Sequence, residues 1–219
     1  KVAPRRDAGS WPPVRHARRM LVLAGCVQPA LMPDVNAAAA RVLDLVGISL
    51  VEAAREGGLW NIFYANVSMM KTPERWLAAA LKERDVGRAL LFTVETPDGE
   101  VVGTTRYMRM APQHRRLEIG GTFYATRVQR TGANTEAKRM LLAHAFEVME
   151  VQAIQIRTDS LNKRSQAAIE RLGAKKDGVL RGHQVMADGR IRDSVVYSII
   201  DREWPGVRAN LDYLLGKHE

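Results

Sequence analysis

The strongest pattern along the chain is the alternation of apolar and polar residues on both sides of two Asp-Gly pairs. Residues 88–110 read RALLFTVETPDGEVVGTTRYMRM, and residues 178–200 read GVLRGHQVMADGRIRDSVVYSII. An Asp-Gly pair between two such runs is typical of a tight hairpin turn, because glycine adopts positive φ angles at little cost. We therefore predict two β-hairpins, which turn at Asp98-Gly99 and at Asp188-Gly189.

Two further strands are predicted between the hairpins. The segment RRLEIGGTFYATRVQ (115–129) is the first, and its adjacent Gly120 and Gly121 indicate a bulge or a close approach of two backbones. The second is VQAIQIRTDSLN (151–162).

Four segments have the residue pattern and the end signals of helices. In KTPERWLAAALKERD (71–85), Thr72 suits the cap and Pro73 the first helical position. The other three cover residues 135 to about 149, 163–174 and 207–216, the last following a break at Trp204-Pro205. Hairpins joined by helices indicate an α+β fold, a sheet with helices on its faces.

The N-terminal third contains two candidates for the first strand. These are RMLVLAGCV (19–27) and RVLDLVGIS (41–49). The sequence predicts one strand followed by a helix in residues 19–60 and leaves the choice between the two open.

Positive charge is concentrated at the beginning of the chain. The formal net charge is +9, and residues 1–20 alone contain six Lys or Arg and one Asp. We interpret residues 1–18, rich in Pro and Arg, as a solvated arm that is dispensable for folding and turnover, and residues 19–219 as a single domain. A basic arm can attract nucleic acid. However, aromatic residues make up only 6% of the chain and do not cluster, so base stacking has little support.

Cysteine and hydropathy narrow the classes of protein. Cys26 is the only cysteine, which excludes an intramolecular disulfide and a cysteine-rich metal site. It lies in an apolar run and is interpreted as a buried thiol. No apolar run approaches the roughly 20 residues of a membrane-spanning helix. A cytoplasmic protein without a metal and without a membrane partner is expected.

The segment VQRTGANTEAKRMLLAHAFEVM (128–149) carries the candidate chemistry. A turn with Gly132 leads directly into a helix, whose first backbone N–H groups lack partners within the helix and bind phosphate well. A nucleotide-binding P-loop would need a Lys followed by Ser or Thr after the last glycine, and a dinucleotide fingerprint would need three spaced glycines. Neither is present, so the turn suits a pyrophosphate held without a metal.

This turn, Gln129-Arg130-Thr131-Gly132-Ala133-Asn134, resembles the Q/R-x-x-G-x-G/A loop of the GNAT superfamily of N-acetyltransferases. With TDSLNKRSQAAIERLGAKKDGVLRGH (158–183), it is similar to the ribosomal-protein N-terminal acetyltransferase-like (Rim-type) branch. The resemblance covers about residues 70–205 and is most specific in 116–183. Asn134 replaces the usual Gly or Ala, but Asn tolerates left-handed backbone angles. The implied fold is GNAT-like, with a mixed, mostly antiparallel sheet of six to seven strands and helices on both faces.

The resemblance implies acetyl-CoA as the co-substrate. Its pyrophosphate would bind the turn and the start of the helix, at Gln129, Arg130, Thr131, Gly132, Ala133, Asn134 and Thr135. The thioester carbonyl would meet the backbone after the glycine pair, at Thr122, Phe123 and Tyr124. Asn162, in the N-x-x-S pattern that opens the next helix, would also contact the co-substrate, and it suits a helix cap whatever the function.

The resemblance also implies the catalytic groups. Glu118 matches the base that deprotonates the acceptor amine, frequently through a water molecule. The alternation of LEIGGTF places it opposite Leu117 and Ile119, so it is not forced into the core with them. The competing interpretation of Glu118 is a solvent-facing strand residue paired with Arg115 or Arg116.

Alternatives remain at each step. Asp177 is the other candidate for the base. Ser165 is the candidate that protonates the leaving thiolate, with Tyr197 as its alternative, although a tyrosine in a hairpin strand is more often in the core. His183 is a candidate for the wall of the acceptor pocket.

The expected function is direct acetyl transfer to a primary amine, of a protein N-terminus or of a small molecule. Two alternatives stay open: a ribosome- or nucleic-acid-associated binding protein that uses the basic arm, and a catalytically silent acyl-CoA sensor. The partners expected are acetyl-CoA and the acceptor; nucleic acid is not favoured, and a homodimer is left open.

Overall fold

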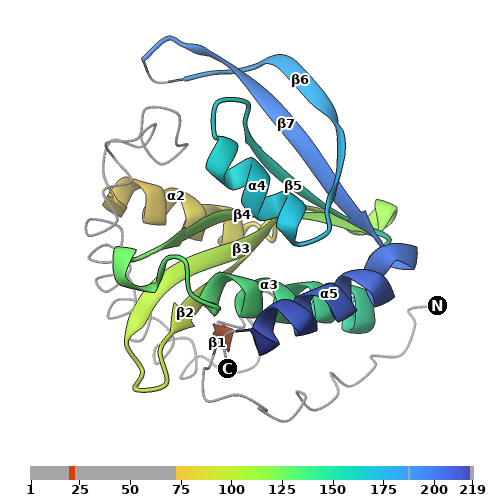
Figure 1. Ribbon diagram of the computed structural model, residues 1–219. Coiled ribbons are helices and arrows are strands. Elements are labelled where there is room, and N and C mark those ends of the chain that lie inside the picture. The colour runs from red at the N-terminus through yellow and green to blue at the C-terminus, as the bar shows by residue number, and fades with distance from the viewer. Residues whose placement is uncertain (1–19, 23–72, 187, 218–219) are drawn as a thin grey trace, which may run out of the picture.

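The computed structural model describes residues 20–22, 73–186 and 188–217. Its centre is a seven-stranded sheet with the order β1-β2-β3-β4-β5-β7-β6 (Figure 1). Every neighbouring pair is antiparallel except β4 and β5, which are parallel. The expected mixed, mostly antiparallel sheet is confirmed.

The strands have the following bounds: β1 Met20–Val22, β2 Ala89–Glu95, β3 Val101–Ala111, β4 Arg116–Tyr124, β5 Ala153–Asp159, β6 Lys175–Val185 and β7 Ile191–Ile200. The predicted hairpins are β2–β3 and β6–β7. Their turns contain Gly99 at φ +90° and Gly189 at φ +83°, as the Asp-Gly pairs require.

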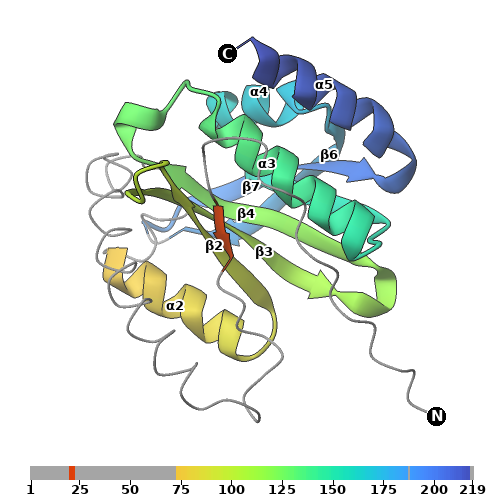
Figure 2. The same cartoon turned by 90° about the horizontal axis from the view of Figure 1, so that it is seen from below.

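The helices lie on both faces of the sheet. They are α2 Pro73–Asp85, α3 Ala133–Ala143, α4 Lys163–Arg171 and α5 Trp204–Gly216. Figure 2 shows α2 on one face and α3 with α5 on the other. No helix in the described part of the chain is long and apolar enough to cross a membrane.

Two helix ends differ from the sequence prediction. Trp204-Pro205 does not interrupt the chain before α5 but forms its first turn, because proline has no N–H to lose at that position. The helix expected from residue 135 to about 149 begins at Ala133 and changes at His144–Val148 to a π-helical turn.

The first strand lies in the earlier of the two candidate segments. β1 pairs with β2 through Met20↔Val94 to Val22↔Phe92, inside residues 19–27. The alternative at 41–49, Thr72 and the 1–18 arm lie outside the described residues.

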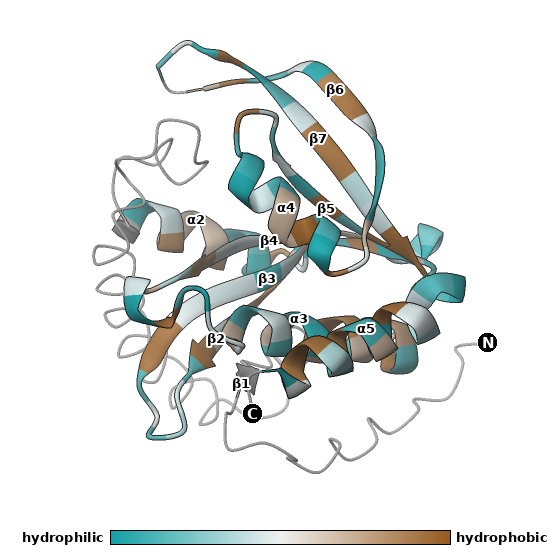
Figure 3. Ribbon diagram, in the orientation of Figure 1, coloured by the Kyte–Doolittle hydropathy of each residue, from teal (hydrophilic) through white to brown (hydrophobic). Residues whose placement is uncertain are grey.

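The main core lies between the sheet and α3, α4 and α5. Leu117 and Ile119 of β4 and Ile154 and Ile156 of β5 pack in one cluster with residues of α3, α4 and α5. Figure 3 shows bands of hydrophobic residues along β7 and on α3 and α5. Because successive side chains of a strand point to opposite faces, the residues between these apolar ones point to the α2 face.

The parallel strands β4 and β5 separate soon after they begin. Their paired residues run from Arg116↔Ala153 only to Glu118↔Gln155, although β4 continues to Tyr124 and β5 to Asp159. Gly121, at φ +59°, lies in the predicted bulge, where the register of β4 against β3 shifts. Among the described residues, no strand therefore pairs with the β5-facing edge of β4 beyond Glu118.

Candidate active site

A cavity of about 800 Å³ lies in the gap between the separating strands. Most of the residues predicted from the sequence line it: Glu118, Thr122, Phe123, Tyr124, Gln129, Arg130, Thr131, Asn134, Asn162 and Ser165. Five predicted residues are not in its wall: Gly132, Ala133, Thr135, Asp177 and Tyr197. The structure thus brings to one cavity the turn predicted to bind phosphate (residues 129–134, the phosphate turn), the β4 segment predicted to meet the thioester (residues 122–124) and one of the two candidate bases.

The turn before α3 is held by its own side chains. The Thr131 hydroxyl donates to the Val128 carbonyl at 2.7 Å and accepts from the Ala133 N–H at 3.2 Å. The left-handed residue is Arg130, at φ +64°, whereas Gly132 has φ −64° and Asn134 is helical. The tolerance of Asn134 for left-handed angles is therefore not needed, because α3 begins one residue before it.

The start of α4 lies against this turn. The Arg164 guanidinium donates to the Gln129 side-chain oxygen at 2.7 Å, and the Asn162 side chain accepts from the Ser165 N–H at 2.9 Å. Asn162 is thus the helix cap that the sequence predicted. Arg171 of α4 donates to the buried Thr135 hydroxyl at 3.0 Å, which ties α4 to α3.

Glu118 lies at the last β4–β5 pair, on the face away from α3. Its carboxylate accepts from Arg109 at 2.8 Å and lies 3.2 Å from the Arg157 Nε. The residue is only 4% exposed, so the interpretation of Glu118 as a solvent-facing residue paired with Arg115 or Arg116 is wrong. Residues of β3 and β5, far apart in sequence, supply its partners.

The two alternative catalytic residues lie elsewhere. Asp177 is on β6, where its carboxylate accepts from the Ser198 hydroxyl at 2.7 Å at an exposed position. Tyr197 is 1% exposed within the main core, and its hydroxyl donates to Glu170 at 2.8 Å. Burial first, and then this contact with Glu170, raises the pKa of Tyr197 to about 12.

Comparison with known proteins agrees with this geometry. The acetyltransferase (GNAT) domain matches residues 51–175, more than half of the chain. The chain belongs to this family. The matched domain is an acyltransferase domain.

Relatives include Rim-type proteins, as the sequence motifs suggested. A Bacillus subtilis protein named as a ribosomal N-acetyltransferase, YdaF, is 27% identical over 72% of this chain and 85% of its own. A GCN5-related N-acetyltransferase from Brucella melitensis is 27% identical, with a TM-score of 0.69 over 79% of each chain. Mycobacterium smegmatis RimJ, solved with CoA-disulfide, is 26% identical, with a TM-score of 0.56 over 65% of this chain and 69% of its own.

A different likeness covers a smaller part of the chain. A stretch of 74 residues, 34% of this chain, is 59% identical to part of the Escherichia coli glycolate oxidase iron–sulfur subunit. The match spans only 17% of that subunit. Iron–sulfur clusters are usually held by four cysteine thiolates. Because this chain has one cysteine, its own residues cannot hold such a cluster.

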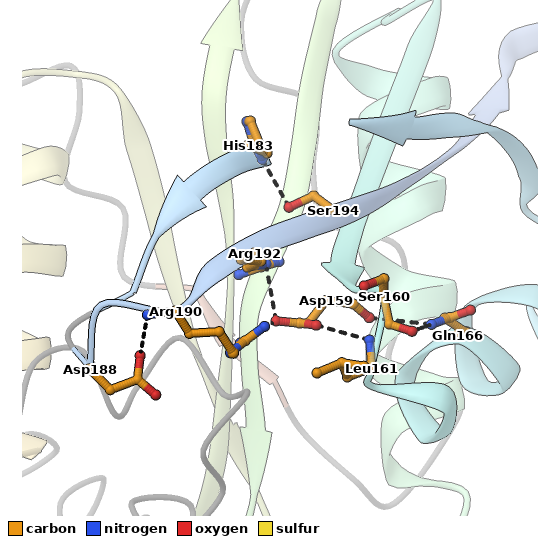
Figure 4. A network of polar contacts seen from close by, with 9 residues as sticks. All are labelled: Asp159, Ser160, Leu161, Gln166, His183, Asp188, Arg190, Arg192 and Ser194. Atoms are coloured by element: carbon orange, nitrogen blue, oxygen red, sulfur yellow. Dashed lines mark hydrogen bonds and ion pairs between the residues drawn. The ribbon is translucent and has the colours of Figure 1, made fainter. Parts of the chain in front are cut away.

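The wall of the cavity is strongly basic. Among the described residues that line it, eight are Arg or Lys and two, Glu118 and Asp159, are acidic. Asp159 is buried and accepts from Arg190 at 2.7 Å, with the Arg192 Nε at 3.6 Å (Figure 4). His183 also lines the cavity, with its Nδ1 at 2.8 Å from the Ser194 hydroxyl. Nowhere in the described ranges do three or more His, Cys, Asp or Glu gather to hold a metal ion.

Lys138 of α3 was not predicted as a site residue. It is 5% exposed, lines the cavity, and donates to the hydroxyls of Thr105 at 3.0 Å and Thr122 at 2.8 Å. Burial lowers the pKa of Lys138 from 10.5 to about 7. The available signal was its position three and four residues before Leu141 and Leu142, on the apolar face of the helix.

Replacing Lys138 with Met is expected to change how stability depends on pH. Between about pH 7 and pH 10.5 the unfolded chain binds a proton at Lys138 that the folded chain does not. The contribution of Lys138 to the free energy of unfolding of the wild type therefore rises with pH across this window and is lowest at and below pH 7. The Lys138→Met variant should be the more stable protein at pH 6 and should lose this advantage by pH 10. Over the whole window the change is about 5 kcal/mol at most, because the pKa falls from 10.5 to about 7 and one pKa unit corresponds to about 1.4 kcal/mol.

Urea denaturation of both proteins at pH 6, 8 and 10 measures this difference. Groups common to the two proteins cancel in the comparison. A difference in stability that is independent of pH would contradict a buried lysine with a lowered pKa.

Proposed function

We propose that the protein is an N-acetyltransferase that moves the acetyl group of acetyl-CoA directly to a primary amine. One observation carries the proposal: the phosphate turn and Glu118 lie in the wall of one cavity, joined by the unpaired edge of β4. Phosphate binding and proton removal would thus occur at two points along one bound thioester.

The start of α3 and the turn before it would hold the pyrophosphate. The first N–H groups of a helix lack partners within it, and the helix dipole favours negative charge there. Arg130, Arg164 and Arg171 add positive charge to the same part of the wall. Farther along the cavity, the Tyr124 hydroxyl is buried, and no group in the described part of the chain forms a hydrogen bond with it, so a polar group of the pantetheine arm would satisfy it.

Glu118 would accept the proton of the amine through a water molecule. The free amine nitrogen then forms a bond to the thioester carbon, and the charge that develops on the carbonyl oxygen is stabilised by backbone N–H groups of Thr122 to Tyr124. As the carbon–sulfur bond breaks, the Ser165 hydroxyl would give its proton to the thiolate. Ser165 would regain a proton, through water, from the nitrogen, which loses its second proton as the amide forms. Tyr197 is the weaker candidate for this step, because its hydroxyl is buried in the core and already donates to Glu170.

The acceptor class is a proposal that rests on relatives. YdaF and RimJ are named for ribosomal N-acetylation and for the Rim branch, which favours a protein N-terminus over other amines.

A cytoplasmic location fits the single cysteine, since reducing compartments keep thiols free.

Release of CoA thiol across a panel of amines tests this function. The panel should hold peptides with free N-termini, matched peptides with blocked N-termini, amino acids and polyamines. We expect CoA release to require both acetyl-CoA and a free amine, with the acetyl group found on that amine by mass spectrometry. Tight acetyl-CoA binding without turnover of any amine would instead support the silent sensor.

A further inference from the structure

Four arginines line the cavity on the face of the sheet turned away from α3. They come from three strands: Arg106 and Arg109 from β3, Arg157 from β5 and Arg192 from β7. This face also carries Glu118, whereas the phosphate turn leads into α3, which lies on the other face. These arginines are therefore placed to meet the acceptor rather than the pyrophosphate.

Three of the four already have carboxylate partners. Arg109 and Arg157 contact Glu118, and Arg192 contacts Asp159. Figure 4 shows Arg190 and Arg192 turned toward Asp159 next to the turn of the β6–β7 hairpin. The two carboxylates of the wall are thus each shared by two guanidinium groups.

Arg106 has neither of these partners. Its guanidinium lies over the Trp76 ring, 5.4 Å from the centroid, and its Nε is buried with no hydrogen-bond partner among the described residues. A side chain added at Gly121 would place its Cβ 2.6 Å from this Nε, so Arg106 lies directly against the bulge of β4. The pKa of Arg106 is lowered by burial and then by the nearby charge of Arg109, while the carboxylates of Glu83 and Glu118 act in the opposite direction.

The position of Arg106 relative to Glu118 indicates how far the acceptor's amine can lie from a group that Arg106 binds. Arg106 pairs with Gly120 across the two strands, two residues beyond Glu118 on the same face of β4. Two residues of a strand span roughly 7 Å. A molecule with its amine near Glu118 can therefore reach Arg106 with a group that lies a few bonds from the amine.

We propose that the preferred acceptor carries a carboxylate a few bonds from its amine, and that Arg106 binds this carboxylate. The planar fork of a guanidinium suits a carboxylate, and the excess of arginines around it repels a second cation. This inference rests on the proposed function, since it names the acceptor class for the same site. Acidic peptide N-termini and short amino acids share this chemistry, while polyamines and lysine-rich N-termini lack it.

Matched acceptors test the inference on the wild-type protein. One set is the dipeptide amides Ala-Asp, Ala-Asn and Ala-Lys, and the other is γ-aminobutyrate against butylamine. We expect kcat/KM to be about tenfold higher for the acid than for its neutral partner, a typical effect of one charged hydrogen bond. Whichever set gives the larger ratio distinguishes a peptide from a small-molecule acceptor.

Arg106→Gln identifies the residue responsible. It should bring the ratio of kcat/KM between the acid and its neutral partner close to one, whatever it does to the absolute rates. Arg208→Gln is the matched control, because Arg208 lies on α5 and contacts Glu147. Thermal unfolding of each variant checks that folding is kept.

The outcomes separate the two proposals. Equal or better turnover of the neutral or the lysine acceptor would overturn the carboxylate inference and leave the acetyltransferase proposal intact. A preference that survives in Arg106→Gln would overturn the role of Arg106. If no amine is acetylated, the proposed function fails. Titration of Ala-Asp amide into the CoA-saturated protein then tests the carboxylate inference by itself. If the amide does not bind, that inference is overturned as well.

Discussion

Replacing Glu118 with Gln is expected to lower kcat by about 10²–10⁴-fold near neutral pH, the usual contribution of a general base. Gln keeps the size of the side chain and part of its hydrogen bonding but cannot take a proton. An acceptor amine is mostly protonated at neutral pH, so the loss should shrink as the pH rises and the free amine becomes abundant. Acetyl-CoA affinity should not change, because Glu118 lies beyond the phosphate turn.

The control for this experiment is Asp177→Asn. It makes the same chemical change at an exposed position outside the cavity wall, so its turnover should stay close to wild type. In the Glu118→Gln variant, Arg109 and Arg157 lose the carboxylate that they share. Thermal unfolding of this variant measures the resulting loss of stability separately from turnover. A crippled Asp177→Asn beside an active Glu118→Gln would transfer the role of base to Asp177. Full activity of both would mean that solvent removes the proton.

Local signals in the sequence were enough for most of the fold. The two hairpins follow from Asp-Gly turns, and the bulge of β4 follows from its adjacent glycines, because the positive φ angle is set by residue type. The start of α5 was misplaced for a related reason: proline reads as a break from sequence, but it is equally suited to a first helical turn.

The environment of the candidate base could not be predicted in this way. The motif identified Glu118, and the alternation of apolar and polar residues along β4 predicted the correct face. However, a residue on the face opposite the main core is not necessarily exposed to solvent. Arg109 lies on β3 and Arg157 on β5, and only the pairing of three strands brings them to one carboxylate. The burial of Lys138 against Thr105 and Thr122 likewise joins a helix to two strands. Contacts of this kind depend on register between distant segments, which single-residue preferences do not encode.

Asn134→Glu is expected to weaken acetyl-CoA binding by on the order of 100-fold or more, since like charges brought together in a binding site cost several kcal/mol. Asn134 is the second residue of α3 and lines the cavity where the pyrophosphate is proposed to bind. The same carboxylate is favourable for the helix itself, by about 0.3–1 kcal/mol, because it faces the positive end of the dipole. Binding should therefore fall while the melting temperature stays level or rises, a combination that misfolding cannot produce.

Asn134→Gln isolates the charge, because Gln has the length of Glu and no charge. Calorimetric titration with acetyl-CoA should give this control an affinity near wild type. The deficit of the Glu variant should narrow as salt is raised from low to high concentration, since counter-ions screen the repulsion. Equal weakening by both substitutions would point to steric blocking rather than electrostatics. Unchanged binding in both would place the pyrophosphate away from the start of α3, and the assignment of the cavity to acetyl-CoA would then have to be abandoned.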